Sequence, residues 1–316
     1  MQNKTPYPKS FLQSDIWGSF RETQGWHAHK LEDVLILERP LPLGKSFLYA
    51  PEVFHHPSLL ITLLPAIYEV AQRRNSLFFR LELNIPKTDP LAQQWRAAFT
   101  YTGFQKAFES VQPDDRQIVT LSGGEHATLK QMKQKGRYNI RVAERAGVTV
   151  RETTLKTLEE DVAIFYALFE ETAKRDKFSI RSQAYFQELA QVLYHHNCGK
   201  VFIASLQGIP LAASITTLYD GVASYLYGAS SSEHRAAMAP YLLHWTVMQW
   251  AMSKNATSYD LLAIKPDTDK KHAYDGITRF KQQFGGESIH LMGSWDVPLQ
   301  ALWYTLFKAA ESIRRH

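Results

Sequence analysis

The 316-residue sequence contains only one cysteine, Cys198. A single cysteine excludes an internal disulfide framework and any cysteine-rich zinc or iron–sulfur site. The paired histidines lack a carboxylate at the spacing of metal ligands, so we predict no metal site. No cofactor is indicated either. The low cysteine content fits a reducing compartment, and we expect a cytoplasmic protein.

Long apolar runs are also missing. The two longest, 59–71 and 201–218, are interrupted by Pro65 and Pro210. They fall short of the roughly 20 residues that a membrane helix needs, so we expect no membrane-spanning segment. The first six residues lack the features of a signal peptide, and we expect no export.

The composition is that of a folded protein of about two domains. Hydrophobic residues make up 45% of the chain and charged residues 21%, which is typical of globular proteins. The formal net charge of +5 favours anionic partners in general, without choosing among nucleic acid, nucleotide and phospholipid.

Apolar periodicity and turn residues predict two α/β units with mixed sheets flanked by helices. In the first unit we expect strands at 34–41, 77–83 and 117–121, and helices beginning after Ser14 and covering 91–101. In the second we expect helices at 125–146, 158–174, 183–195 and from 240, and strands at 200–206, 211–219, 222–227 and 258–264. The order of the second unit is that of an N-acetyltransferase-like (GNAT-like) domain. The predicted domains are 1–122, completed by the C-terminal helix in 295–316, and 123–294.

The most uneven charge lies in 129–151, which contains seven cations and one acid. Arg137, Arg141 and Arg145 recur every four residues, so on a helix they would lie along one side and could meet successive phosphates. With Tyr138 among them, the pattern favours a phosphate-bearing ligand. The alternative is a surface helix whose charges keep it soluble.

A second candidate site is the segment 276–286. Arg279 and Lys281 are two residues apart and cannot share one face of a helix, so one is expected to enter a cleft while the other meets solvent. Lys281 lies between Phe280 and Phe284, where its charge would act strongly on a developing oxyanion. The alternative is an ordinary amphipathic turn closed by glycine.

A third candidate begins at Tyr225 and Tyr227, where a predicted strand ends in small residues before the helix that Pro240 opens. Backbone amides at such a helix start bind anionic or carbonyl groups. Acetyl-CoA enzymes of this element order usually place a glycine-rich basic loop here. No glycine follows Arg235 before the helix, which disfavours CoA.

Several motifs, in the same order along the chain, resemble those of the Fem family of aminoacyltransferases, which build the interpeptide bridges of bacterial peptidoglycan. The matching stretches are 11–14 with Trp17 and 25–26; Lys135, 137–141, Ala143 and 147–148; 171–176 and 178–181; 227–231; 238–242; 279–281; and 284–286. The segment 158–196 has no room for the helical hairpin that some relatives insert, so the chain resembles the short form of the family.

The resemblance implies two GNAT-like domains and transfer of an amino acid from aminoacyl-tRNA to an amine of a muramyl-peptide precursor, either UDP-MurNAc-peptide or its lipid-linked form. It places Lys281 at the reaction centre, with Tyr225 or Tyr227 beside it. We expect a monomer. The basic, apolar C-terminal helix would suit a membrane surface, although packing within the first domain is the favoured interpretation.

The resemblance also implies which residues bind the acceptor. Arg21 and Arg137 or Arg141 would hold its phosphates or muramyl part, and we add Tyr138, Arg279 and Phe280 as neighbouring contacts. Two other functions stay open at this stage. One is an acyl-CoA-dependent N-acyltransferase on a different amine, and the other is a tRNA-binding module that relies on the basic helix alone.

Overall fold

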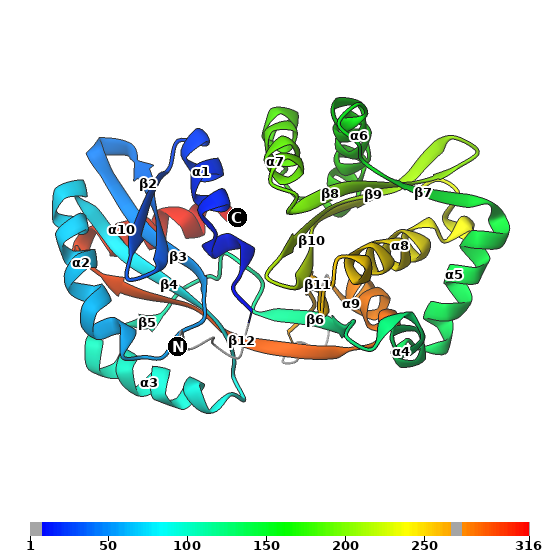
Figure 1. The fold of residues 1–316 in the computed structure, drawn as a ribbon. Helices are drawn as coiled ribbons and strands as arrows, with labels where there is room; N and C mark the ends of the chain where they lie inside the picture. Colours follow the sequence, from blue (N-terminus) through cyan, green and yellow to red (C-terminus); the bar gives the residue numbers. More distant parts are fainter. Residues whose placement is uncertain (1–7, 267–273, 316) are drawn as a thin grey trace. The chain divides into compact units, whose positions relative to one another are not determined.

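The computed structural model describes residues 8–266 and 274–315, with side chains up to residue 312, and it divides into two compact units (Figure 1). Unit 1 runs to Asp114 and resumes at His290, and unit 2 is Asp115–Ile289. The sequence predicted the boundaries at 122/123 and 294/295. The first boundary lies earlier because strand β6 (Asp115–Thr120) pairs antiparallel with β11 (Ser258–Ala263), inside unit 2.

Unit 1 contains a mixed sheet with the strand order β1-β2-β3-β4-β12, in which β5 also pairs with β12. Its strands are β1 (His27–Leu31), β2 (Val34–Leu41), β3 (Lys45–Val53), β4 (Ser76–Pro86), β5 (Gln105–Lys106) and β12 (Glu287–Pro298). Its helices are α1 (Asp15–Thr23), α2 (Leu59–Arg74), α3 (Pro90–Thr102) and α10 (Ala301–Arg315), with short 3-10 helices η1 (Phe11–Gln13) and η2 (Pro42–Gly44).

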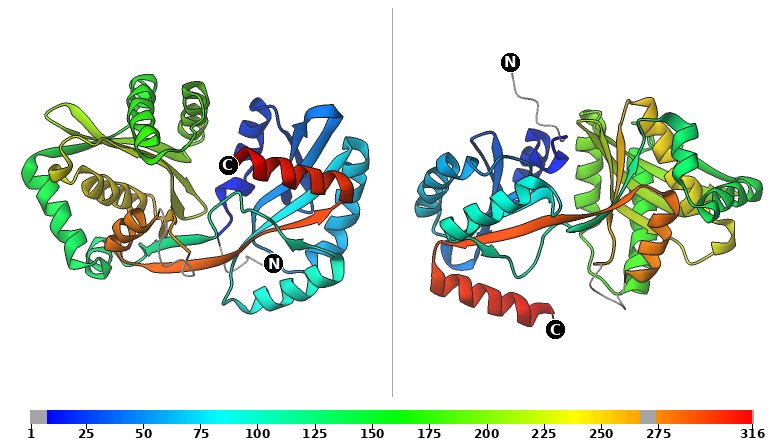
Figure 2. Two further views of the ribbon diagram at one scale, coloured as in Figure 1. Left: turned by 180° about the vertical axis from the view of Figure 1, so that it is seen from behind. Right: turned by 90° about the horizontal axis from the view of Figure 1, so that it is seen from below.

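Helices cover both faces of the unit 1 sheet. Alternate residues of β3 and β4, such as Leu48 and Phe79, belong to the hydrophobic cluster that includes α2 and α3. Their neighbours Phe47 and Phe78 point to the other face, as the alternation of a strand requires, and pack against Phe307 of α10. Figure 2 shows α10 and α3 on opposite sides of the sheet. The C-terminal helix therefore belongs to unit 1.

Unit 2 contains a second mixed sheet, ordered β6-β11-β10-β9-β8-β7. Besides β6 and β11, its strands are β7 (Val148–Glu152), β8 (Gly199–Leu206), β9 (Ile209–Tyr219) and β10 (Val222–Ser230). Its helices are α4 (Gly124–Gln131), α5 (Gln134–Ala146), α6 (Leu158–Asp176), α7 (Gln183–His195), α8 (Ala239–Ser253) and α9 (Asp275–Lys281), with 3-10 helices η3 (Arg235–Ala237) and η4 (Gln282–Phe284).

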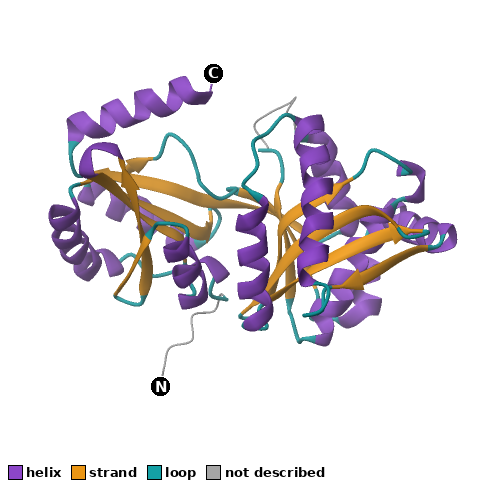
Figure 3. Cartoon of the chain, turned by 90° about the horizontal axis from the view of Figure 1, so that it is seen from above, coloured by secondary structure: helices purple, strands orange, loops and turns teal. Residues whose placement is uncertain are grey.

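The two faces of this sheet are covered by different helices. Helices α6 and α7 lie on one face, and α5 and α8 on the other (Figures 1 and 3). The core under α8 includes Phe202, Val247 and Met248, whereas Phe165 and Phe186 pack together under α6 and α7. The predicted class, α/β with mixed sheets flanked by helices, is confirmed.

Each unit contains two parallel strands joined by a helix, but the two pairs differ in length. In unit 1, β3 pairs with β4 from Ser46 to Val53. In unit 2, β10 pairs with β11 only from Val222 to Ser224, although β10 continues to Ser230. The carboxyl end of β10 therefore leaves its parallel neighbour, and this divergence positions the candidate site.

One predicted helix proves to be two. The sequence indicated a helix over 125–146, but the chain breaks at Met132, whose backbone is extended and whose side chain is buried. The N–H of Lys133 donates to the carbonyl of Gln283 instead of continuing the helix. This tertiary contact ends α4 and starts α5 in a new direction. None of the described helices is both long and apolar enough to cross a bilayer.

Candidate active site

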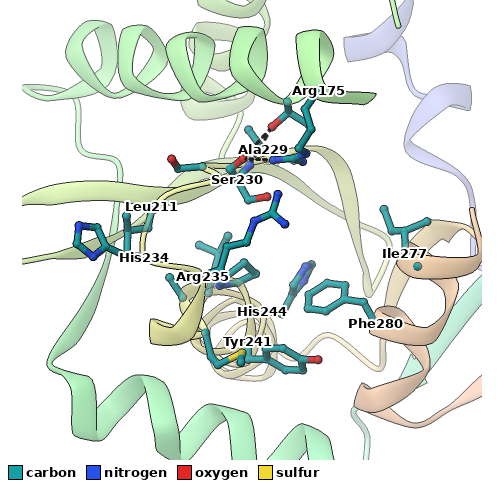
Figure 4. A pocket seen from close by; sticks show the side chains of 18 of the residues that line it. Arg175, Leu211, Ala229, Ser230, His234, Arg235, Tyr241, His244, Ile277 and Phe280 are labelled. Atoms are coloured by element: carbon teal, nitrogen blue, oxygen red, sulfur yellow. Dashed lines mark hydrogen bonds between the residues drawn. The ribbon is translucent and has the colours of Figure 1, made fainter. Parts of the chain in front are cut away.

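A cavity of about 530 Å³ lies in unit 2 beside the diverging end of β10. The last turn of α6, the segment after β10, the start of α8 and helix α9 all contribute to its lining. Figure 4 shows Arg175 and Ser230 on one side of the cavity, with Tyr241 and Phe280 on the other. The cavity is therefore polar at one end and aromatic at the other.

A β-bulge sets the direction of the side chains along β10. Tyr225 pairs with Thr216 of β9 and Tyr227 with the adjacent Ile215, so Leu226 is an extra residue in the strand. The ring of Tyr225 consequently packs against α8, where it lines the cavity. Tyr227 points to the opposite face.

Tyr227 lies among the aromatic side chains of α6 and α7. Its ring packs on Phe169 and Phe186, and its hydroxyl is 3.2 Å from the hydroxyl of Tyr185. The sequence placed Tyr225 or Tyr227 beside Lys281. The structure brings Tyr225 there, whereas the bulge turns Tyr227 away, so that alternative is corrected.

Tyr225 occupies the space beside Gly228. A Cβ atom built on Gly228 would lie 1.5 Å from the Tyr225 hydroxyl oxygen and 1.9 Å from the ring carbon that carries it. Only glycine allows this approach. Burial raises the pKa of the Tyr225 phenol above its usual range, so the hydroxyl stays protonated at neutral pH and can donate a hydrogen bond.

The polar end is organised around the carbonyl of Ser230. The hydroxyl of Thr172 and the guanidinium of Arg175 donate to this carbonyl at 3.2 and 2.9 Å. The same guanidinium is ion-paired with Asp176 at 3.0 and 3.1 Å. Arg235 extends its guanidinium into the cavity (Figure 4) and is the cation best placed to meet an anionic group such as a phosphate.

Helix α8 begins next to Arg235 without a glycine. His234 and Met238, on either side of η3, both have left-handed backbone conformations, with φ of 44° and 52°. Pro240 occupies the first turn of α8, as expected from the sequence. The turn that a glycine would normally provide is thus made by residues that carry side chains, which line the cavity.

His244 contributes to the aromatic wall. It is 1% exposed, and its Nδ1 lies 2.9 Å from the Tyr259 hydroxyl. Its ring contacts Tyr225 and Phe280 at centroid distances of 4.5 and 5.4 Å. Burial, and to a lesser degree the charge of Lys281, lowers the pKa of His244 to about 3, so the imidazole is neutral at pH 7.

Lys281 lies behind this wall rather than among the cavity-lining residues. Its side chain is 3% exposed, and Nζ donates to the carbonyl of Ala263 at 2.7 Å. Nζ is 5.8 Å from the centre of the Tyr225 ring. Burial lowers the pKa of Lys281 to about 8, although the negative charge of Asp260 opposes the shift. The ammonium is therefore still mostly protonated at pH 7.

Asp260 forms a buried ion pair with Arg116 close to the end of β11. One carboxylate oxygen lies 3.1 Å from Arg116, and the other accepts the backbone N–H of Leu262 at 2.7 Å. Leu262 has a positive φ of 54°, and the register of β11 shifts between Asp260 and Ala263. The pair thus fixes the irregular strand end that supplies the carbonyl bonded by Lys281.

Helix α9 holds its two neighbouring cations in different surroundings. Lys281 is buried, Arg279 is exposed, and Phe280 lines the cavity between them. Ile277 lies one turn earlier and also faces the cavity (Figure 4). Phe280 is consequently the part of this motif that a ligand would touch first.

The three arginines of the basic helix have different environments. The guanidinium of Arg137 donates to the carbonyls of Leu129 and Met132, the last carbonyls around the end of α4. Arg141 and Arg145 are exposed on α5. The three arginines of the predicted row are therefore not equivalent, because the break after α4 gives the Arg137 guanidinium backbone partners.

The remaining predicted residues lie apart from the cavity lining. Tyr138 is 53% exposed on α5. Arg21 belongs to unit 1, where it is buried and its guanidinium stacks on Trp26 at 4.1 Å from the ring centre. Among the described residues, no group of three His, Cys, Asp or Glu side chains gathers as metal ligands would.

The cavity-lining residues that were not singled out from the sequence as site residues include Arg175, Arg235, Tyr241 and His244. Tyr241 and His244 are three residues apart on α8, so their shared face could be read from helical spacing once the helix was placed. Nothing in the local sequence shows that Arg175 meets Ser230, which is 55 residues away.

Comparison with known families gives a clear assignment. The FemAB family model matches residues 55–207 and 196–312 of the chain, which is most of its length. The chain belongs to the FemAB family. The resemblance inferred from the sequence motifs is thereby confirmed.

Curated relatives of this FemAB protein include the lipid II:glycine glycyltransferases of Staphylococcus saprophyticus and Staphylococcus aureus. Each is 20% identical, over 94% of this chain and 90% of the relative. Among solved structures, the crystal structure of FemX has a TM-score of 0.82 at 20% identity, covering 95% of this chain and 94% of FemX. A tandem GNAT protein of clavulanic acid biosynthesis has a TM-score of 0.51 at 10% identity, covering 84% of this chain and 78% of that one.

Proposed function

We propose that this FemAB protein transfers an amino acid from aminoacyl-tRNA to an amine of a peptidoglycan precursor, and that the cavity beside β10 holds the reacting ester. Family membership supports an aminoacyltransferase, and the relatives named lipid II:glycine glycyltransferases support a lipid-linked muramyl-peptide as acceptor. The observation that carries the proposal is a cavity with arginines at one end and a neutral hydrogen-bonding wall, backed by a buried ammonium, at the other.

The cavity suits the aminoacylated 3′ end of a tRNA. Its terminal nucleotide combines a phosphate, an aromatic base and an aminoacyl ester. Arg235 can bind the phosphate by charge-assisted hydrogen bonds, beside the Arg175–Asp176 ion pair. Tyr241 and Phe280 offer aromatic faces on which a base stacks. This arrangement would direct the ester towards Tyr225 and His244.

The chemistry needs little beyond positioning and charge stabilisation, because the ester is already activated. The neutral acceptor amine attacks the ester carbonyl and forms a C–N bond, and the carbonyl oxygen becomes negative. Collapse breaks the bond to the ribose oxygen, and the proton that the amine loses ends on that oxygen as the free hydroxyl. The protonated hydroxyl of Tyr225 can donate to that oxyanion. The Lys281 ammonium, 5.8 Å from the Tyr225 ring, adds positive potential in surroundings of low dielectric constant.

Acceptor binding is a separate part of the proposal. Tyr138, Arg141 and Arg279 are exposed and can reach anionic groups of the acceptor. Arg21 and Arg137 are already held by Trp26 and by the end of α4, so their roles in acceptor binding stay predictions. We place the reaction in the cytoplasm, with the protein acting as a monomer.

The test measures transfer of radiolabel from a charged tRNA mixture to purified lipid II or to UDP-MurNAc-pentapeptide. Wild-type protein should label at least one acceptor, and the label should appear as a peptide-linked amino acid by mass spectrometry. The runner-up function, acyl transfer from CoA, is tested in parallel with acetyl-CoA and the same acceptors. Transfer from acetyl-CoA alone would reject the tRNA-dependent reaction and support the runner-up.

A further inference from the structure

Helix α10 carries apolar side chains on the face that does not pack on unit 1. Leu302, Trp303 and Leu306 are 72%, 37% and 52% exposed. Leu302 and Leu306 are four residues apart, so they lie one turn apart on the same side of the helix. The fold does not need these side chains in its core, because other residues of α10 attach the helix to the sheet.

The attachment of α10 uses its opposite face. Tyr304 is 3% exposed, and its hydroxyl donates to the carboxylate of Asp296 at 2.8 Å. Phe307 packs on Phe47 and Phe78 at centroid distances of 5.9 and 5.2 Å. The helix is therefore firmly docked, and its outward apolar face is presented by a rigid support.

A cation borders the apolar face. Lys45 Nζ lies 4.7 Å from the centre of the Trp303 ring. Apolar side chains with a tryptophan, bordered by cations, are the features of helices that lie in the interface of an anionic bilayer.

A neighbouring loop adds to this surface. Leu43 is 80% exposed in η2, two residues before Lys45, and its backbone has a positive φ of 61°. Lys45 also donates to the side chain of Gln300, just before α10, at 2.9 Å. The loop and the start of the helix are thus held together in unit 1.

We propose that Leu302, Trp303 and Leu306, with Leu43 and Lys45, form a peripheral docking surface for an anionic lipid bilayer. A second copy of the chain fits less well, because a two-fold contact would bring Lys45 of both copies to the same apolar surface. The proposal goes beyond the transfer reaction and does not depend on it, since lipid binding is measured without donor or acceptor.

The experiment is co-sedimentation of the full chain with vesicles of phosphatidylcholine, with and without phosphatidylglycerol. Wild-type protein should bind the vesicles that contain phosphatidylglycerol, and added salt should weaken the binding. The double variant Leu302→Asp/Leu306→Asp should reduce binding at least about tenfold, because it replaces the inserted apolar groups by charges that anionic lipid repels. The milder Leu302→Ser/Leu306→Ser should reduce it less.

Ile61→Asp is the matched control. Ile61 is 76% exposed on α2, which covers the other face of the unit 1 sheet, so this change should leave vesicle binding as in the wild type. Far-ultraviolet circular dichroism would establish that each variant is folded. Absence of wild-type binding to both kinds of vesicle, or an equal loss in Ile61→Asp, would overturn the proposal. So would variants that dissociate a dimer while leaving vesicle binding intact.

Discussion

Tyr225 and Tyr227 are two residues apart on the same strand, yet their rings lie on opposite faces of the unit 2 sheet. In a regular strand, residues i and i+2 share a face. The extra residue at the bulge between them reverses this relation, so Tyr225 faces His244 and Tyr227 faces Phe186. Tyr225 therefore lines the cavity, whereas Tyr227 packs in the core under α6 and α7.

This difference predicts unequal effects of removing the two hydroxyl groups. Tyr225→Phe should lower kcat for aminoacyl transfer by about 100-fold, the usual cost of losing one oxyanion donor, with little change in KM. Tyr227→Phe, which loses the hydroxyl contact with Tyr185 on the face away from the cavity, should change kcat by less than about threefold. Steady-state kinetics with labelled donor would measure both. Equal losses in the two variants would contradict the assignment of Tyr225.

Gly228→Ala should displace Tyr225. The new methyl group would overlap the phenol, and overpacking of this kind typically lowers the free energy of unfolding by about 1–3 kcal/mol. The double variant Gly228→Ala/Tyr225→Ala should cost less than the sum of the two single variants, because the clash is absent once the ring is removed. Urea denaturation of the four proteins would measure this coupling. Strict additivity would show that Tyr225 does not occupy the space.

Lys281 should make stability depend on pH. Its pKa is about 8 in the folded protein against 10.5 as the ordinary value, so between these pH values the unfolded chain binds more protons. The free energy of unfolding should therefore rise with pH through this window, and the cost of burying the ammonium is fully present below pH 8.

Lys281→Met should abolish this rise and raise the free energy of unfolding at pH 7 by up to about 3 kcal/mol. Chemical denaturation from pH 7 to 10.5 would compare the variant with the wild type. Arg279→Met, an exposed neighbour, is the control and should keep the wild-type slope. Parallel curves for Lys281→Met and wild type would contradict the lowered pKa.

Arg137→Ala should destabilise the fold rather than act only on acceptor affinity. Its guanidinium satisfies the carbonyls at the end of α4, and loss of such contacts costs about 1–2 kcal/mol at a partly exposed site. Arg141→Ala, one turn along α5 and exposed, should change stability by less than about 0.5 kcal/mol. Thermal denaturation would separate the two. An unchanged melting temperature in Arg137→Ala would show that the guanidinium is free to bind ligand.

Unit 1 should be sensitive to loss of its buried ion pair. Arg80 and Asp296 are 3% and 0% exposed and form two hydrogen bonds of 2.7 and 2.8 Å. Arg80→Met should lower the free energy of unfolding by about 3–5 kcal/mol, because it leaves a buried carboxylate without its partner. Arg80→Met/Asp296→Leu should recover part of this loss. A double variant less stable than Arg80→Met would refute the explanation.

Much of the fold could be predicted because its signals are local. The strand at 34–41 and the helix at 183–195 have the predicted bounds, and Ser14 caps α1 through its hydroxyl. Periodicity and capping depend on residues within one or two turns. Strands such as β1 and β7 were not predicted, since their sequences are half exposed and mixed in polarity.

The candidate site was predictable only in part, because sequence patterns report on residues that are near one another in the chain. The spacing of Arg279 and Lys281 correctly separated an exposed from a buried cation. The position of His244 beside Tyr225, and of Arg175 beside Ser230, depends on contacts between residues 19 and 55 positions apart. No local pattern encodes such distances.

The sequence by itself determined the family, the α/β class, most helices and the motif that contains Lys281, because each of these depends on short runs of neighbouring residues. Only the tertiary structure decided which tyrosine faces the cavity, why Arg137 has backbone partners, and that the Lys281 ammonium lies behind an aromatic wall. Those outcomes depend on strand register, on one bulge and on where a helix breaks, and each of these is fixed by packing between segments far apart in the chain.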